Sequence, residues 1–193
     1  MKCSKQSMCA CNKVMKVLGM IKRTIRFKDL RVMLSLYKPL VRPYVECCIS
    51  VWNPHYKKDK ELIEKVQRRF TKMINNMEGK PYEEKLYCLK LWTLDERRNR
   101  QDLIEVFKVC NGLSRLKLNE FFTLADNKRG TRGHSRKLIK FRCTRDCCKY
   151  FFSNRVINRW NQLDQRVVDA SSINAFKGCL NKIRETRMGF FMD

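Results

Sequence analysis

Apolar residues recur at helical spacing over most of the chain. In the first part they fall at Val14, Val17, Leu18, Ile21 and Ile25, with lysines and arginines between them. A repeat near 3.6 residues places such positions on one face of a helix. The pattern therefore predicts an amphipathic helix close to the beginning of the chain.

The most regular apolar stripe lies in residues 59–77. Its members are Leu62, Ile63, Val66, Phe70, Met73, Ile74 and Met77. Lys65, Arg68, Arg69 and Lys72 lie off this stripe, so they form a basic face on the same predicted helix. These four side chains are the first candidates for contact with phosphate groups.

Helix boundaries are marked by capping signals. Thr93 with Glu96 three residues later has the spacing of a capping box, and the pair Asn111-Gly112 suits the end of the same helix. Ser172 is placed to cap a last helix.

Two prolines interrupt another helical pattern. Asp29 is a candidate cap for a helix that continues to Cys48, but Pro39 and Pro43 lie inside it. An interior proline costs about 3 kcal/mol because it lacks an N–H and its ring meets the preceding turn. We therefore expect a kink or a break there.

The predicted fold class is mainly α, a helical bundle with a loop-rich basic segment. Gly (7) and Pro (4) are scarce, which favours helices over a turn-rich sheet fold. Helical periodicity fades in residues 114–150, where a small β-hairpin around Leu138–Phe151 is one interpretation. We expect a helical region at 1–113, the basic segment at 114–150, and a C-terminal helical segment at 151–193 that packs on the rest.

The charge balance points to a polyanionic partner. The chain carries 43 Lys and Arg against 19 Asp and Glu, a formal net charge of +24. Nucleic acid is the usual polyanion for such a protein. A membrane partner is not expected, because no stretch approaches the roughly 20 apolar residues that span a bilayer. The basic N-terminus has no apolar stretch after it, so we expect an intracellular protein, nuclear or cytoplasmic, rather than a secreted one.

A basic run from Lys128 to Lys140 supplies a second set of candidates. Its candidate phosphate contacts are Arg132, His134, Arg136 and Lys137. Gly130 and Gly133 would let a backbone approach phosphate closely. The alternative is a basic face that only contacts solvent, but the cationic excess is global, so binding is the favoured interpretation.

Arg97, Arg98 and Arg100 crowd the first turns of the helix that Thr93 begins. Cations at a helix N-terminus are unfavourable by roughly 0.3–1 kcal/mol each. A bound phosphate would relieve this cost, so Arg97 and Arg98 join the candidates. The alternative partners are the nearby carboxylates Asp95, Glu96 and Asp102.

No motif for catalysis is present in the sequence. Polymerase and nuclease chemistry needs clustered carboxylates that hold two metal ions. The chain has no adjacent pair of aspartates, no Tyr-x-Asp-Asp, no P-loop and no Gly-x-Ser-x-Gly. We therefore predict no catalytic residue and no cofactor.

The eleven cysteines allow two interpretations. His134, Cys143, Cys147 and Cys148 could form a zinc site, but no Cys-x-x-Cys pair occurs. Free thiols in a reducing compartment are the favoured interpretation, with Cys47 and Cys48 in the core and no metal.

Six aromatic residues could stack on bases, but core packing is the favoured role. They are Tyr44, Trp52, Trp92, Phe151, Phe152 and Trp160.

Several short segments of the sequence form an ordered series. The first group is Leu36-Tyr37-x-x-Leu40-Val41-Arg42-Pro43, Glu46-x-Cys48, Trp52-x-Pro54, Glu64-Lys65-Val66-Gln67-Arg68-Arg69 and Thr71-Lys72-Met73-Ile74. The second group is Tyr82-Glu83-Glu84-Lys85-Leu86, Arg97-Arg98, Thr131-Arg132-Gly133-His134-Ser135, Phe151-Phe152-Ser153-x-Arg155-Val156 and Trp160-Asn161-x-Leu163. Together they resemble the region after the palm in LINE-type (non-LTR, jockey-like) retrotransposon reverse transcriptases. They run in that family's order from about Val17 to the last predicted helix, while Pro39, Cys47 and Asp164 depart from its pattern.

This resemblance implies a helical thumb, which grips a template–primer duplex, followed by a downstream C-terminal segment. The catalytic aspartates of the family lie upstream, in the palm. The chain is then expected to be a C-terminal fragment of an RNA-directed DNA polymerase that binds an RNA–DNA hybrid or duplex without reading sequence. Two alternatives stay open: a fragment that works with a palm on another chain, and an unrelated basic helical scaffold.

Overall fold

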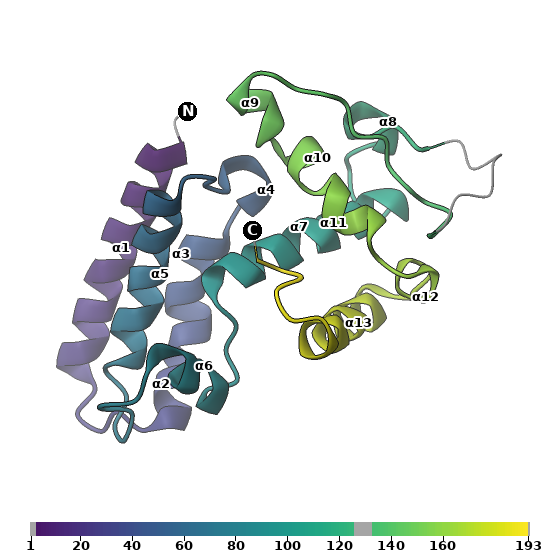
Figure 1. The fold of residues 1–193 in the computed structure, drawn as a ribbon. Helices are drawn as coiled ribbons and strands as arrows, with labels where there is room; N and C mark the ends of the chain where they lie inside the picture. Colours follow the sequence, from purple (N-terminus) through teal and green to yellow (C-terminus); the bar gives the residue numbers. More distant parts are fainter. Residues whose placement is uncertain (1–2, 126–132, 193) are drawn as a thin grey trace. The chain divides into compact units, whose positions relative to one another are not determined.

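The structure is a computed structural model that describes residues 3–125 and 133–192. It confirms a mainly helical chain (Figure 1). The chain divides into two compact units, Met1–Arg98 and Asn99–Asp193. We expected a boundary after residue 113. The observed boundary lies earlier, inside the continuous helix α7 (Leu94–Cys110).

The first unit holds the elements from α1 to α6 and the beginning of α7. They are α1 (Cys3–Thr24), α2 (Leu30–Leu36), the π-helical segment η1 (Tyr37–Val41), α3 (Arg42–Glu46), α4 (Ile49–Trp52), α5 (Lys57–Thr71) and α6 (Tyr82–Cys88). Helix α1 packs along α5 and α3 (Figure 1). Val14, Leu18 and Ile21 on α1 are buried, as are Ile63 and Phe70 on α5. Complete burial of such a side chain stabilises the fold by about 1.5–3 kcal/mol.

The expected kink at Pro39 takes the form of a wider turn. Helix α2 continues into η1, where the N–H of Arg42 donates to the carbonyl of Tyr37, five residues back. A π-type turn lengthens the repeat locally and keeps the chain helical around the missing proline N–H. Pro43 then lies in the first turn of α3, where its missing N–H costs least.

Helix α5 ends at Thr71, earlier than the apolar stripe predicts. Residues 72–77 form turns, although Ile74 and Met77 stay buried. Asn76 has φ +63°, a left-handed conformation that a regular helix does not accommodate. The apolar pattern therefore continues into the core beyond the end of the helix.

The second unit holds the rest of α7 and the six following helices. They are α8 (Leu118–Phe121), α9 (Asp146–Lys149), α10 (Phe152–Arg155), α11 (Ile157–Asn161), α12 (Gln165–Val168) and α13 (Ile173–Thr186). Phe107 of α7 stacks on Phe176 of α13 with ring centroids 4.3 Å apart, and Trp160 of α11 is fully buried. The C-terminal helix thus packs on α7 inside this unit.

The capping signals are confirmed. The Thr93 hydroxyl accepts from the N–H of Glu96 at 3.2 Å, and the Glu96 carboxylate accepts from the N–H of Thr93 at 3.1 Å. Ser172 accepts from the N–H of Ala175 at 3.1 Å. Gly112, just after α7, has φ +67°, which glycine adopts without strain.

The hairpin expected around Leu138–Phe151 is wrong. Leu138 forms one isolated antiparallel bridge with Leu124, and part of the expected second strand is α9. The side chain of Asn161 explains the outcome: it accepts from the N–H of Leu138 at 2.9 Å and donates to its carbonyl at 2.8 Å. These bonds occupy the two backbone groups that a further strand would need.

Among the described residues, no helix is long and apolar enough to cross a lipid bilayer.

Candidate nucleic-acid interface

Helix α5 presents its predicted basic face to solvent. Its opposite side is buried through Ile63, Val66 and Phe70, and this fixes the outward direction of the rest. The four candidates all lie on the outward side and are exposed: Lys65, Arg68, Arg69 and Lys72. The structure therefore brings these four together as the sequence pattern predicts, and their role in binding stays a prediction.

The contacts of this face leave its charges available. The Arg68 guanidinium lies over the ring of Tyr82, 5.0 Å from its centroid, and Arg69 Nη1 lies 3.7 Å from the sulfur of Met15 on α1. Neither contact neutralises a charge. None of the four cations forms an ion pair with any residue that the structure describes. Glu61 is the one carboxylate exposed on the same side of α5.

Helix α1 adds cations that the sequence motifs did not indicate. The first 28 residues contain eight Lys and Arg and no Asp or Glu. Helix α1 exposes five of them, namely Lys5, Lys13, Lys16, Lys22 and Arg23. A run this long without an acid is the sequence signal that would have identified them.

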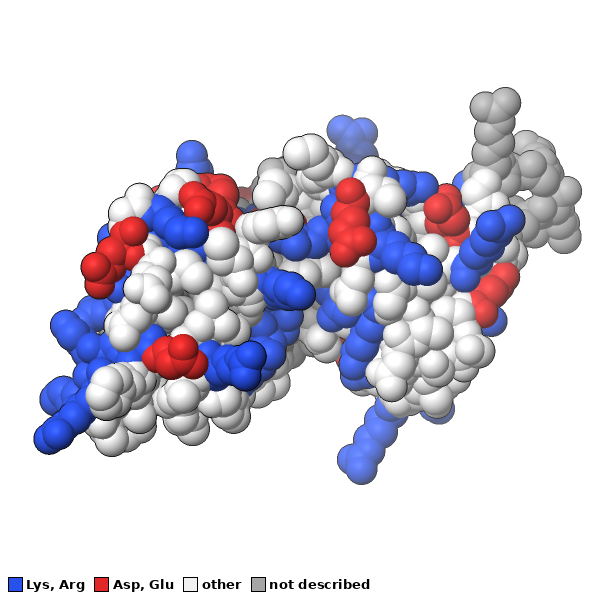
Figure 2. Space-filling view, turned by 90° about the horizontal axis from the view of Figure 1, so that it is seen from below, with Lys and Arg blue, Asp and Glu red and all other residues white. Residues whose placement is uncertain are grey.

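The two helices run parallel and side by side. Ser4 donates to Asp59 at 2.5 Å near the start of both, and the Met15–Arg69 contact lies further along. The cations on their C-terminal halves, together with Lys72 directly after α5, make up what we call the α1–α5 basic surface. It consists of Lys16, Lys22, Arg23, Lys65, Arg68, Arg69 and Lys72. Figure 2 shows one face of the molecule, where Lys and Arg side chains are spread over the surface with Asp and Glu between them.

Arg98 is not a phosphate contact as predicted, because its guanidinium is inside the first unit. The residue is 2% exposed. Nη2 donates to the carbonyl of Val45 at 2.7 Å, and the guanidinium lies 4.5 Å from the ring centroid of Trp52. An internal carbonyl and an indole ring thus take the place predicted for a phosphate.

Arg97 makes a two-pronged contact with Glu46 of α3, with Nη2 2.7 Å from Oε2. Its charge is therefore already paired. The carboxylates expected as partners are used elsewhere: Asp95 pairs with Lys60 at 3.2 Å, and Asp102 accepts from Arg155 at 2.8 Å. Both carboxylates thus have a basic partner far along the chain, which spacing within α7 did not indicate.

His134 is also wrong as a phosphate contact. It is 1% exposed, and its Nε2 donates to the carbonyl of Trp160 at 2.9 Å. Nδ1 accepts from the N–H of Arg136 at 3.2 Å. Burial lowers the pKa of His134, so the ring is neutral at physiological pH and helps to hold the loop against α11.

The remaining candidates of the basic run differ in their surroundings. Arg132 and Gly130 lie outside the described residues. Arg136 is half-buried and donates to the side chain of Asn111 at 2.8 Å. Gly133 has φ +117°, and a Cβ there would collide with Cε of Lys137. The space that this glycine leaves is occupied by the end of the Lys137 side chain, and close approach of a phosphate there stays a prediction.

The cysteines do not form the zinc set that the sequence allowed. Within the described ranges, no group of three or more His, Cys, Asp or Glu side chains is placed to hold a metal ion. His134 is bonded to Trp160 and Arg136 instead. Cys47 and Cys48 are exposed, so their prediction as core thiols is wrong, whereas Cys11 on α1 is buried.

Comparison with known proteins gives no relative from which a role could be transferred. No family model, no curated protein and no solved structure matches this chain.

Proposed function

We propose that this chain binds an RNA–DNA hybrid or a duplex through phosphate contacts, without reading the base sequence. The sequence resemblance to the thumb and downstream region of LINE-type reverse transcriptases supports this proposal. So does the charge of both units: residues 1–98 carry 23 Lys and Arg against 10 Asp and Glu, and residues 99–193 carry 20 against 9.

The observation that carries the proposal is the α1–α5 basic surface. Its seven cations are exposed on two packed helices, and none is paired within the described part of the chain. From Lys65 to Lys72 the rise along α5 is about 10 Å. Phosphates on one strand follow each other at about 3.4 Å along the axis, so this face spans roughly three of them.

Binding of this kind neutralises charge and releases counterions. Its intrinsic strength is typically about 10⁻⁴–10⁻⁶ M at physiological salt. Within this chain Lys65, Arg68, Arg69 and Lys72 would each approach a phosphate oxygen. The surface contains no clustered carboxylates, so the proposed role is to hold a nucleic acid and not to transform it.

The test compares two variants with the same reduction in charge. The first changes Lys65, Arg68, Arg69 and Lys72 to Gln; the second changes Arg26, Arg31, Lys38 and Lys90 to Gln, all exposed in the same unit. Affinity for a fluorescent DNA duplex and for an RNA–DNA hybrid is measured by anisotropy. We expect the first variant to bind about tenfold more weakly or worse, and the second to stay much closer to the wild type.

Equal weakening by both variants would show that only net charge matters and would contradict a defined surface. Absence of binding by the wild type would overturn the function and favour a basic scaffold for protein contacts.

The proposal also excludes polymerisation by this chain alone. A metal-dependent primer-extension assay with the purified chain should give no product, because no paired aspartates are present to hold the two metal ions. Nucleotide incorporation above the level of a protein-free control would contradict this prediction.

A further inference from the structure

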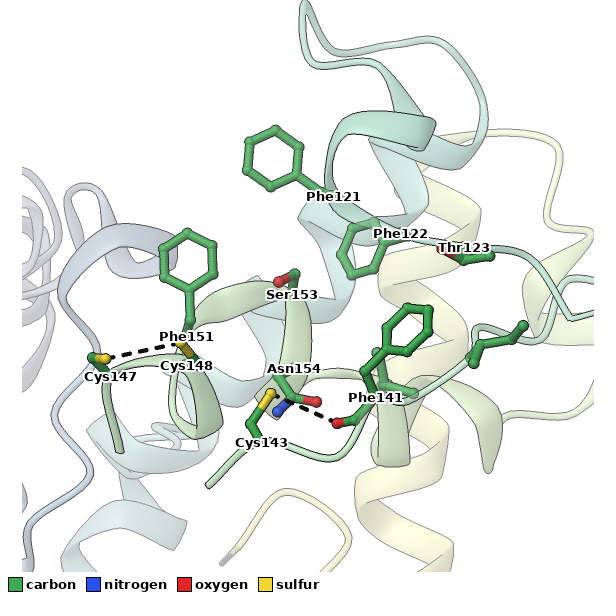
Figure 3. A pocket seen from close by; sticks show the side chains of 12 residues that line it. Phe121, Phe122, Thr123, Phe141, Cys143, Cys147, Cys148, Phe151, Ser153 and Asn154 are labelled. Carbon is green, nitrogen blue, oxygen red and sulfur yellow. Dashed lines mark hydrogen bonds between the residues drawn. The ribbon is translucent and has the colours of Figure 1, made fainter. Parts of the chain in front are cut away.

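The second unit contains an open pocket of about 340 Å³ that the phosphate-binding proposal does not use (Figure 3). That volume is within the usual range for small-ligand sites, about 300–1,000 Å³. The rings of four phenylalanines surround it: Phe121, Phe122, Phe141 and Phe151. Phe122 is buried at its base, in an edge-to-face contact with Phe152 at 5.7 Å between centroids.

Two of these rings are exposed to a degree that is unusual for phenylalanine. Phe141 is 61% exposed and Phe151 is 45% exposed. Apolar surface exposed to water is unfavourable by about 25 cal/mol per Å². A flat apolar ligand that covers the rings at the mouth of the pocket would remove this surface from water and so be bound there. Core packing, the role favoured for Phe151 from the sequence, is wrong for that residue, whereas Phe152 is buried as predicted.

A polar side chain lies in the same wall. Asn154 is 8% exposed and lines the pocket beside Phe141 and Cys143 (Figure 3). No hydrogen bond of its side-chain amide to another described residue is seen, and the amide atoms are accessible to solvent and to a ligand. Because the amide has both a donor and an acceptor, it can bond to the edge of a nucleobase.

The segment that supplies much of the lining is strongly basic. Lys140 and Arg142 flank Phe141, and Arg145 and Lys149 follow before Phe151. All four are exposed, and none forms an ion pair with a described residue. Unpaired cations beside an aromatic pocket complement a ligand that is both flat and anionic, which an apolar peptide or an acyl chain is not.

We propose that this pocket receives an unpaired nucleobase of a single-stranded nucleic acid, with Phe141 or Phe151 stacked on the base and Lys140 and Arg142 on the flanking phosphates. Base–aromatic stacking tolerates any base, because each base has a π-face. Asn154 would bond to the edge of the inserted base. The inference rests on the proposed function and adds single-stranded segments to its ligands.

The test separates stacking from charge. Fluorescent oligothymidylate is compared with an abasic strand of equal length and equal phosphate number, using the full chain. We expect the wild type to bind oligothymidylate more tightly than the abasic strand. Phe141→Ala and Phe151→Ala should each weaken binding of oligothymidylate about fivefold to a hundredfold and leave the abasic strand unchanged.

Two further variants remove ambiguity. Phe141→Leu keeps apolar bulk but has no ring face, so it should behave like Phe141→Ala, and Phe27→Ala changes an exposed phenylalanine of the other unit and should have no effect. Equal affinity of the wild type for both strands overturns the pocket proposal but leaves phosphate binding standing. Failure of the wild type to bind either strand also overturns the pocket proposal, whereas failure to bind the duplex and the hybrid overturns the proposed function.

Discussion

At the scale of single residues, some basic side chains of this chain are buried and bonded internally, whereas others are exposed to solvent. Arg98 and His134 look like phosphate contacts in the sequence, but both side chains are bonded to internal carbonyls. Lys65 and Lys72 have no such partner and stay in solvent. Sequence spacing predicts the outward face of α5 because it depends on one helix. It cannot predict the burial of Arg98, because Val45 and its other partners come from distant positions.

The neutral state of His134 gives a prediction on pH. Burial lowers its pKa below the ordinary 6.5, so the folded protein holds fewer protons there than the unfolded chain. The stability it contributes is complete above pH 6.5 and is lost as the pH falls below that value. Urea unfolding at about pH 7.5 and about pH 5 should show a larger loss of stability for the wild type than for His134→Gln.

The difference between the two proteins is simple to assign to His134, since the sequence contains only one other histidine, His55. Curves that run parallel for wild type and His134→Gln over this pH range would show that the ring is not held neutral by the fold.

At the scale of elements, α5 has a buried side that holds it in the core and an exposed side that carries the basic residues. Its inner side includes the buried Gln67, whose Oε1 accepts from the hydroxyl of Tyr37 at 2.6 Å. Its Nε2 donates to the hydroxyl of Tyr82 at 3.1 Å and to the carbonyl of Trp92 at 2.9 Å. These bonds fix the rotation of α5 and therefore the direction of its basic face. An apolar stripe locates the helix but does not reveal such a network.

Gln67→Leu should destabilise the protein by about 1–3 kcal/mol, because the Tyr37 hydroxyl and the Trp92 carbonyl would be left without this partner in the interior. The measurement is the free energy of urea unfolding. Lys65→Gln, on the exposed side of the same helix, serves as the control and should stay within about 0.5 kcal/mol of the wild type. A Gln67→Leu protein as stable as this control would contradict the role of the network.

Element boundaries were predictable where a local signal sets them. Thr93, Glu96 and Ser172 cap their helices as their spacing indicates, because a cap needs only neighbouring residues. Pro39 marks an irregularity, yet the sequence did not reveal that a π-type turn would absorb it. The hairpin failed because Asn161, far along the chain, bonds to the backbone of Leu138.

At the scale of the whole molecule, charge is the property that both units share. Each has about twice as many basic as acidic residues, with 23 against 10 and 20 against 9. A positive field of this size attracts polyanions whatever the fold beneath it. Composition alone predicts this property, whereas the division of the chain within α7 depends on the long-range packing of each end of that helix.

Phosphate binding is tested most directly by the salt dependence of the affinity for a B-form DNA duplex. Contact with phosphates predicts a straight log–log plot of affinity against salt with a slope of about −0.9 per phosphate neutralised. Replacing Lys65, Arg68, Arg69 and Lys72 by Gln should make that slope less steep by about 0.9 for each phosphate that these side chains neutralise in the wild type. A flat plot for the wild type, or the same slope for both proteins, would contradict nucleic-acid binding through this surface.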